Sequence, residues 1–213
     1  MGEAVQLVKA GNNGIEALTD LVASAKSLAQ SALSADTSVE IKSLESQFNA
    51  VMTQINELSD DAGYKGVNLL DGTDNTLKVS FDEKGDSAVT LTGFDANHTA
   101  LGLSTVASAD WVAGTTDNAE TTQLNLVISQ LDSARSTLRS EAKTLADNLS
   151  TITIRQDFTQ KMINTLDDGA DNLTLADMNE EGANMLMLQT RQGLGTSSLS
   201  MASQAAQSVL RLF

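Results

Sequence analysis

Residues 124–152 read LNLVISQLDSARSTLRSEAKTLADNLSTI, and their spacing decides the fold. A leucine or isoleucine stands at every seventh position from Leu124 to Ile152, and the same step continues to Leu166. A second, interleaved series runs from Ile128 to Ile163. Because seven residues complete two turns of a coiled-coil helix, the pattern predicts one helix with a packed seam from about Ala119 to Asp167. Polar residues interrupt the two series, where they can set register, at Arg135, Gln156 and Thr159.

The length of this helix constrains the rest of the molecule. About 48 helical residues span roughly 70 Å, which cannot fold back into a compact domain. The sequence Asp167-Asp168-Gly169 is expected to loosen or end the helix. We therefore predict a mainly α fold: an elongated, rod-like helical bundle with heptad seams, plus a small β-hairpin and loop insertion.

Two further helices are predicted upstream. From Glu3 to Leu33, small and aliphatic residues recur at alternating steps of three and four, the period of one helix face. Gly11 to Gly14 is a weak point in this pattern. The second helix begins after a cap at Thr37 or Ser38 and ends near Ala62-Gly63, where glycine favours a stop. Its apolar seam is Ile41, Leu44, Phe48, Val51, Ile55, Leu58 and Ala62.

The character of the sequence changes between Gly63 and about Asn118, where Gly, Asp, Asn and Thr are frequent and the helical period is lost. Apolar and polar residues alternate around Val79 and again around Leu91, with the polar run 82–86 between them. This arrangement predicts a β-hairpin within residues 63–92. Residues 93–118 then form a short insertion.

A last helix is predicted from Leu175 to Leu212, and its composition differs from the rest of an acidic chain. From Gly182 to Phe213 the only charged side chains are Arg191 and Arg211. A helix that is apolar around most of its circumference must be buried by something. Two alternatives stay open from the pattern alone, a self-assembly segment or a fourth helix of a closed bundle. The candidate assembly residues are Met185, Leu186, Leu188, Leu194, Leu199, Met201, Ala202, Val209, Leu210, Leu212 and Phe213.

Composition excludes several classes of function. The net charge of −15 opposes binding to nucleic acid and to anionic lipid surfaces. No apolar run is long enough for a membrane span, and the first residues do not resemble a secretory signal peptide. The chain has no Cys, and its one histidine, His98, lies in a Gly/Asn-rich loop where we expect a solvated side chain. We therefore predict no catalytic residue, no metal site, no cofactor and no enzyme activity.

The C-terminal stretch carries a family resemblance. The run Ala176-Asp177-Met178-Asn179-Glu180-Glu181-Gly182-Ala183-Asn184 and the ending Leu212-Phe213 resemble the C-terminal signature of bacterial flagellins, in particular alphaproteobacterial ones. So do Gln189, Gly195, Leu199, Ala202 and Gln207–Leu210. Upstream, Gln54–Leu58 and Tyr64–Gly72 resemble the junction between a flagellin helix and its hairpin.

The resemblance implies a domain organisation. Residues 1–62 and 119–172 would form the helical rod domain with the hairpin 63–92, and residues 93–118 the short variable insertion. Residues 173–213 would be the C-terminal helix that lines the inner tube of a filament. Flagellins carry a further N-terminal helical stretch before the equivalent of Glu3. We therefore expect this chain to be a fragment that needs a partner to order its tail.

The resemblance also implies partners and a place of action. Flagellins are structural subunits of the extracellular filament for motility, and they are exported from the cytoplasm without a cleaved signal peptide. The implied partners are copies of the chain itself and a flagellar export chaperone on the C-terminal helix. Two alternatives are a hook–filament junction protein and a cell-surface glycan-binding flagellin homologue. Only one Trp and one Tyr are present, which disfavours a platform for stacking sugars.

A receptor patch is the last feature that the resemblance implies. Flagellins of other bacterial lineages are sensed by a host Toll-like receptor through an Arg-Glu patch on the first rod helix. The equivalent positions here are Lys26, Ser27, Leu28 and Gln30. Lysine replaces the bidentate arginine and serine replaces the glutamate, so we predict poor activation of that receptor.

Overall fold

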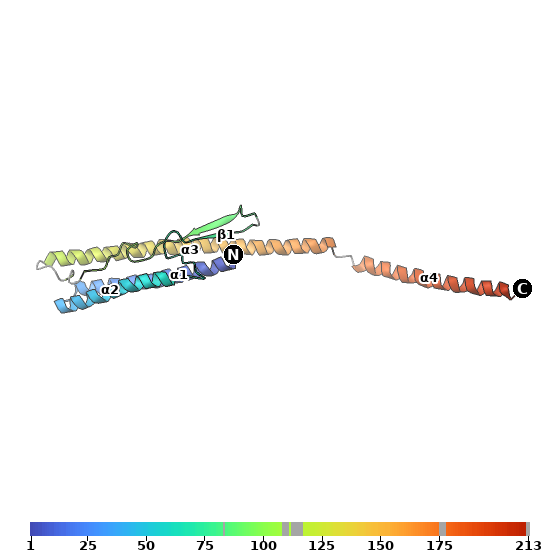
Figure 1. Cartoon of the computed structure of the whole chain (residues 1–213), viewed down its shortest axis with the longest axis horizontal. Helices are drawn as coiled ribbons and strands as arrows, with labels where there is room; N and C mark the ends of the chain where they lie inside the picture. Colours follow the sequence, from blue (N-terminus) through green and yellow to red (C-terminus); the bar gives the residue numbers. More distant parts are fainter. Residues whose placement is uncertain (83, 108–110, 112–116, 175–177, 212–213) are drawn as a thin grey trace. The chain divides into compact units, whose positions relative to one another are not determined.

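The computed structural model describes residues 1–82, 84–107, 111, 117–174 and 178–211. The chain divides into two units, which we call the N-terminal unit (Met1–Gln160) and the C-terminal unit (Lys161–Phe213). The mainly α fold class is confirmed. The elements in chain order are α1 (Gly2–Leu33), α2 (Ser38–Asp61), β1 (Thr76–Ser80), β2 (Ala88–Thr92), α3 (Asp117–Thr174) and α4 (Met178–Leu210) (Figure 1).

Helix α1 buries the face that its period predicted. Small and aliphatic residues from Ala4 to Ala32 point into the core at steps of three and four. The helix continues through Gly11 and Gly14, where the sequence predicts a weak point, and both glycines are buried. A Cβ atom added to Gly14 would stand 2.6 Å from Leu70 Cδ1 and 2.8 Å from Ala62 Cβ. The glycine is therefore a point of close approach between α1 and its neighbours.

Helix α2 begins as its cap predicted. The Thr37 hydroxyl accepts a hydrogen bond from the Glu40 backbone N–H at 3.3 Å. Phe48 and Ile55 of the expected seam of α2 are buried, but Leu44, Val51 and Leu58 are only half-buried. The residue that follows each of these three is buried in its place: Glu45, Met52 and Ser59. The shift follows from what covers this face, since the Ser59 hydroxyl donates to the Leu70 carbonyl of the following loop at 2.9 Å.

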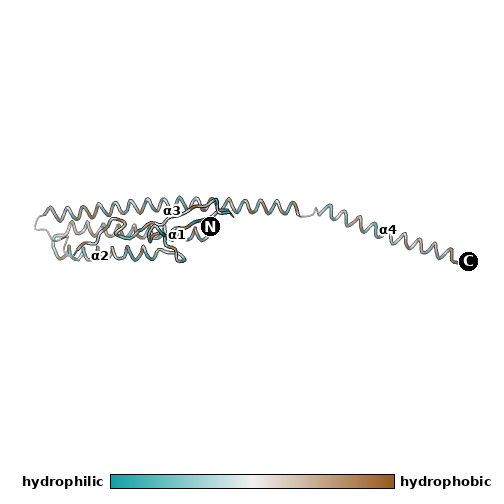
Figure 2. Tube along the Cα trace, turned by 45° about the horizontal axis from the view of Figure 1, so that its top comes forward, coloured by the Kyte–Doolittle hydropathy of each residue, from teal (hydrophilic) through white to brown (hydrophobic). Residues whose placement is uncertain are grey.

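Helices α1 and α3 pack antiparallel in the N-terminal unit. A Cβ atom on Gly11 would lie 3.4 Å from Leu145 Cδ1, and Lys26 pairs with Asp132 further along the same contact. Both views draw α1, α2 and this part of α3 side by side (Figures 1 and 2). The predicted heptad positions Leu124, Leu131, Leu138, Leu145 and Ile152 are all buried.

The predicted hairpin is confirmed. Strands β1 and β2 pair antiparallel with Leu77 opposite Leu91 and Val79 opposite Val89, and Val79 and Leu91 face the core. The hairpin contacts α3 through the Phe81 ring, whose centroid lies 5.5 Å from the Arg155 guanidinium carbon. A cation over an aromatic face is attracted by the ring quadrupole.

The segment expected as a short insertion contributes to the same core. Leu101, Leu103 and Trp111 are buried, and the Trp111 ring packs against Phe48 of α2 with centroids 5.1 Å apart. Asn49 fixes the backbone of this segment, because its side-chain amide donates to the Val106 carbonyl and accepts from the Val106 N–H. The remaining residues of the segment, 108–110 and 112–116, lie outside the described part of the chain.

Helix α3 extends beyond its predicted end. It continues through Asp167-Asp168-Gly169 to Thr174, so the expected stop is wrong. One glycine costs an α-helix only about 1 kcal/mol relative to alanine, and neither aspartate breaks the hydrogen-bond ladder. The N-terminal unit nevertheless ends at Gln160, so α3 belongs to both units.

Candidate assembly surface

The C-terminal unit buries none of its described side chains. Every described residue from Lys161 to Arg211 is exposed. On α4, four consecutive apolar residues, Met185 to Leu188, are 63%, 67%, 52% and 69% exposed. Because successive residues of an α-helix are 100° apart, these four side chains point in four directions around the axis. The apolar surface of α4 therefore encircles the helix and does not form one stripe.

The residues predicted for assembly lie on this surface. Nine of the eleven predicted residues are described, and all nine are exposed: Met185, Leu186, Leu188, Leu194, Leu199, Met201, Ala202, Val209 and Leu210. The other two, Leu212 and Phe213, lie outside the described residues. Met178 and Met187 are further exposed apolar residues of α4 that the prediction omitted. A count of apolar residues without regard to heptad position would have found both.

Charge is scarce along α4. Glu180 and Glu181 stand in the first turn, where the helix dipole favours anions. Between Glu181 and Arg211, Arg191 carries the only charge. The polar side chains of α4 are mostly uncharged Ser, Thr, Asn and Gln, and soluble monomers rarely expose large contiguous apolar areas.

The end of α3 carries a second exposed apolar surface. The heptad series leaves the core after Ile152, and Ile163 and Leu166 are exposed. Both residues lie beyond Leu145, the position of α3 that lies beside Gly11 of α1.

A separate stripe on α3 was missed by the sequence reasoning. Ile154, Phe158 and Met162 are exposed and stand four residues apart. Ile154 is two residues, or 200°, from the buried Ile152, so the stripe lies on a different face from the seam. In the sequence these three residues recur every four positions, whereas the predicted seams recur every seven.

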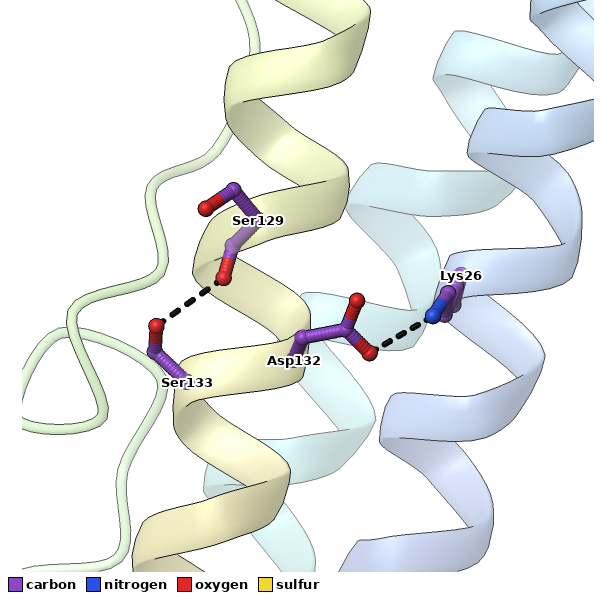
Figure 3. Close-up of polar contacts among 4 residues, drawn as sticks. All are labelled: Lys26, Ser129, Asp132 and Ser133. Carbon is purple, nitrogen blue, oxygen red and sulfur yellow. Dashed lines mark hydrogen bonds and ion pairs between the residues drawn. The ribbon is translucent and has the colours of Figure 1, made fainter.

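The positions equivalent to a receptor patch lie on α1 beside α3. Lys26 is half-buried, and its Nζ lies 2.6 Å from Asp132 Oδ1 of α3 (Figure 3). On the same turn of α3 the Ser133 hydroxyl donates to the Ser129 carbonyl at 3.0 Å. Ser27 and Gln30 are exposed and Leu28 is half-buried. The one cation of this patch is therefore engaged within the chain.

His98 is less solvated than predicted. It is half-buried, and both its backbone N–H and its ring Nδ1 bond to the Asn56 side-chain oxygen, at 2.9 and 2.8 Å. Among the described residues, no group of three His, Cys, Asp or Glu side chains is placed to hold a metal ion. The helices described here also lack the combination of length and apolar character that a bilayer crossing requires.

Similarity to known proteins identifies the family. Flagellin FljM of Caulobacter vibrioides is 34% identical over 202 residues, which cover 93% of this chain and 69% of that protein. Flagellin FljO of the same species is 32% identical with the same coverage. The flagellin of Brucella melitensis is 28% identical over 100% of this chain and 76% of its own length. The chain belongs to the flagellin family, as the resemblance predicted. No protein-family model matches it.

A solved structure agrees on the fold. The crystal structure of Bacillus cereus flagellin aligns with a TM-score of 0.53 and 16% identity, covering 86% of this chain and 92% of that one. At this identity the likeness concerns the architecture, long helices with a small sheet, and not particular side chains.

Proposed function

We propose that this chain is a structural subunit of a flagellar filament, assembling with copies of itself outside the cell. The observation that carries the proposal is the C-terminal unit, in which every described residue is exposed and the apolar side chains of Met185–Leu188 surround α4 at one turn. The role is structural, and no chemistry on a substrate is part of it. Family membership supports the filament, and the exposed surface supports the way the subunit joins it.

The geometry of α4 favours several neighbours over one. A single groove covers one side of a helix and would leave part of the Met185–Leu188 ring in water. Only contacts from several directions bury all four side chains, which a lattice of parallel subunits provides. The alternative of a fourth helix in a closed bundle also covers mainly one side. The small residues Gly193, Gly195 and Ala202 let neighbouring helices approach closely.

The exposed end of α3 belongs to the same proposal. Ile163 and Leu166 stand beyond Ile152, the last buried position of the seam. In the filament, we propose, a helical segment of the same or a neighbouring subunit covers this end of α3. The stripe Ile154, Phe158 and Met162 faces another direction and takes a second contact.

An export chaperone is part of the proposal for the unassembled state. Before assembly, the apolar ring on α4 is a hazard for aggregation in the cytoplasm. A chaperone that binds α4 would cover much of this surface until the chain is exported.

A hook–filament junction role would use the same helices, but the matched relatives are flagellins. Nothing in the described chain favours a glycan-binding role.

Electron microscopy tests the proposal directly. The chain is compared under polymerising conditions with a deletion of residues 182–213 and with a variant carrying Met185→Ser, Leu186→Ser and Leu188→Ser. We expect filaments from the unaltered chain and none from these two variants. A matched control is Val39→Ser, which removes another exposed apolar side chain, from α2 in the N-terminal unit, and should still form filaments. Filaments from the deletion would contradict the proposal.

Weak recognition by the host receptor is a second, separate proposal. Lys26 is engaged by Asp132, and position 27 carries serine, so the patch offers neither a free bidentate cation nor a carboxylate. The double substitution Lys26→Arg with Ser27→Glu should raise the response of receptor-reporter cells. A strong response to the unaltered chain would overturn this proposal without affecting the filament.

A further inference from the structure

Sulfur is distributed very unevenly between the two units. The chain has no Cys and seven Met. Two Met lie in the N-terminal unit, where Met52 is 0% exposed and Met1 is half-buried. The other five lie in the C-terminal unit, and all are 44–84% exposed: Met162, Met178, Met185, Met187 and Met201.

The methionines of α4 are placed on opposite sides of the helix. Met178 and Met185 are seven residues apart and share one side, while Met187 and Met201 are fourteen apart and share another. Met185 and Met187 are separated by two residues, or 200°. A neighbouring helix that packs on either side of α4 therefore meets a thioether.

We propose that these methionines are modification sites through which peroxide-class oxidants control assembly, switching it off before the subunit is buried. This inference rests on the proposed assembly role of α4. The thioether sulfur attacks one peroxide oxygen and the O–O bond breaks as the S–O bond forms. The sulfur loses two electrons to become a sulfoxide, and the other oxygen takes the proton and leaves as water or an alcohol.

Oxidation makes the apolar methionine side chain polar, and packing of α4 depends on its apolar character. A sulfoxide is polar and chiral, and burial without a hydrogen-bond donor costs enough to disfavour the contact. Where a buried sulfoxide finds no donor on the neighbouring helix, it should raise the lowest assembling concentration roughly tenfold or more. Once neighbours cover α4, the same sulfurs are shielded, so oxidation should act on the free subunit and spare the filament. Methionine sulfoxide reductases would restore the thioether.

The test begins with peptide mass mapping of the complete chain after timed treatment with hydrogen peroxide. We expect Met178, Met185, Met187 and Met201 to be oxidised at least about ten times faster than Met52, because access of the oxidant sets the rate. Equal rates would overturn the inference. In filaments, the four α4 sites should react at rates close to that of Met52.

Assembly is then measured with and without peroxide, for the unaltered chain and for a variant with leucine at all four α4 positions. Leucine has a similar volume and no oxidisable sulfur, so peroxide should not change the assembly of this variant, whatever its level before treatment. Met52→Leu is the matched control and should stay peroxide-sensitive. Treatment with a methionine sulfoxide reductase should restore assembly of the oxidised unaltered chain.

The outcomes separate this inference from the proposed function. If the unaltered chain assembles equally well before and after oxidation of α4, the inference is wrong and the assembly role stands. If the four-leucine variant loses assembly after peroxide as fully as the unaltered chain, the methionines are not the sites. Filaments from the chain without residues 182–213 would overturn the proposed function itself.

Discussion

The N-terminal and C-terminal units use the same kind of residue in opposite ways. Both are helical and rich in leucine, methionine and small residues. In the N-terminal unit, leucines at steps of seven face α1 and the hairpin and are buried, Leu131 and Leu138 at 0% exposure. In the C-terminal unit, Leu186, Leu188 and Leu194 are about two-thirds exposed. An apolar helix thus stabilises a fold only where the same chain supplies a surface to cover it.

The two units also differ in how many charges they carry and where these charges lie. Of the 28 acidic residues, six lie in residues 161–213, together with three of the 13 basic residues. That leaves 22 acidic and ten basic residues, a net charge of −12, in residues 1–160. The N-terminal unit has a core and a strongly charged surface. The described residues of the C-terminal unit form no core, and few charges lie beyond residue 182, the opposite of what an independent soluble domain needs.

Limited trypsin digestion should give the largest difference between the two units. Arg139 and Arg191 are both exposed on helices, but α3 packs on α1 around Arg139 while α4 buries nothing. Helices draw most of their stability from packing, so α4 should open far more readily. We expect cleavage at Arg191 at least about a hundred times faster than at Arg139. Comparable rates would mean that the free subunit protects α4.

Paired leucine truncations test the same contrast by stability. Leu138→Ala removes a fully buried side chain and should lower the free energy of unfolding by about 2–5 kcal/mol. Leu194→Ala, at 67% exposure, should change it by less than about 0.5 kcal/mol. Urea unfolding followed by circular dichroism measures both. A large loss from Leu194→Ala would show that α4 has a packing partner within its own chain.

Two glycines of α1 should respond in opposite directions to alanine. At Gly14 the new methyl group meets Leu70 and Ala62 within 3 Å, and overpacking typically costs about 1–3 kcal/mol. At Gly11 the nearest atom is 3.4 Å away, so Gly11→Ala should gain up to about 1 kcal/mol of helix propensity. Thermal unfolding distinguishes them. Stabilisation by both substitutions would show that α1 and α2 separate easily at Gly14.

The ion pair between Lys26 and Asp132 should contribute a smaller amount. Its two side chains are 26% and 53% exposed, so solvent and salt screen the attraction. We expect Lys26→Met or Asp132→Asn to lower the free energy of unfolding by no more than about 1 kcal/mol, with a smaller effect in high salt. A double-mutant cycle isolates the pair. An unchanged effect at high salt would argue against an electrostatic origin.

The pair of Lys65 and Glu3 should give the smallest effect and a defined pH dependence. The hydrogen bond and the charge of Glu3 raise the pKa of Lys65 above its ordinary value of 10.5. A raised pKa in the folded state stabilises the fold below pH 10.5, and this contribution is lost as the pH rises through the folded-state pKa. The melting temperatures of the unaltered chain and Glu3→Gln should therefore converge at high pH. A difference that persists there would have another cause.

Much of the fold could be predicted from the sequence because it depends on local periodicity. The steps of seven from Leu124 to Ile152 identified the buried face of α3, and the alternation around Val79 and Leu91 identified the hairpin. The cap at Thr37 was equally local. The scarcity of charge singled out the stretch that forms α4, but from the pattern alone its apolar residues could be exposed or buried in a bundle.

Other features could not be predicted because they depend on a neighbour distant in the sequence. Gly14 is a point of close approach because Leu70 and Ala62 lie against it. His98 is half-buried and its ring bonds to the side chain of Asn56, which lies 42 residues away in the sequence. Trp111, expected in the short insertion, is buried in the core, where its ring packs against Phe48 of α2. The boundary that the family resemblance implies near residue 172 stays a prediction.

The sequence by itself determined which faces of the helices are apolar and which stretch carries almost no charge. Periodicity and composition are enough for this, since each residue's position around its own helix follows from 100° per step. Only the tertiary structure decided which apolar faces are covered. The seam on α3 is buried as far as Ile152, whereas Ile163 and Leu166 are exposed. An apolar face is buried only where another element of the chain packs on it, and the period along one helix does not say where that happens.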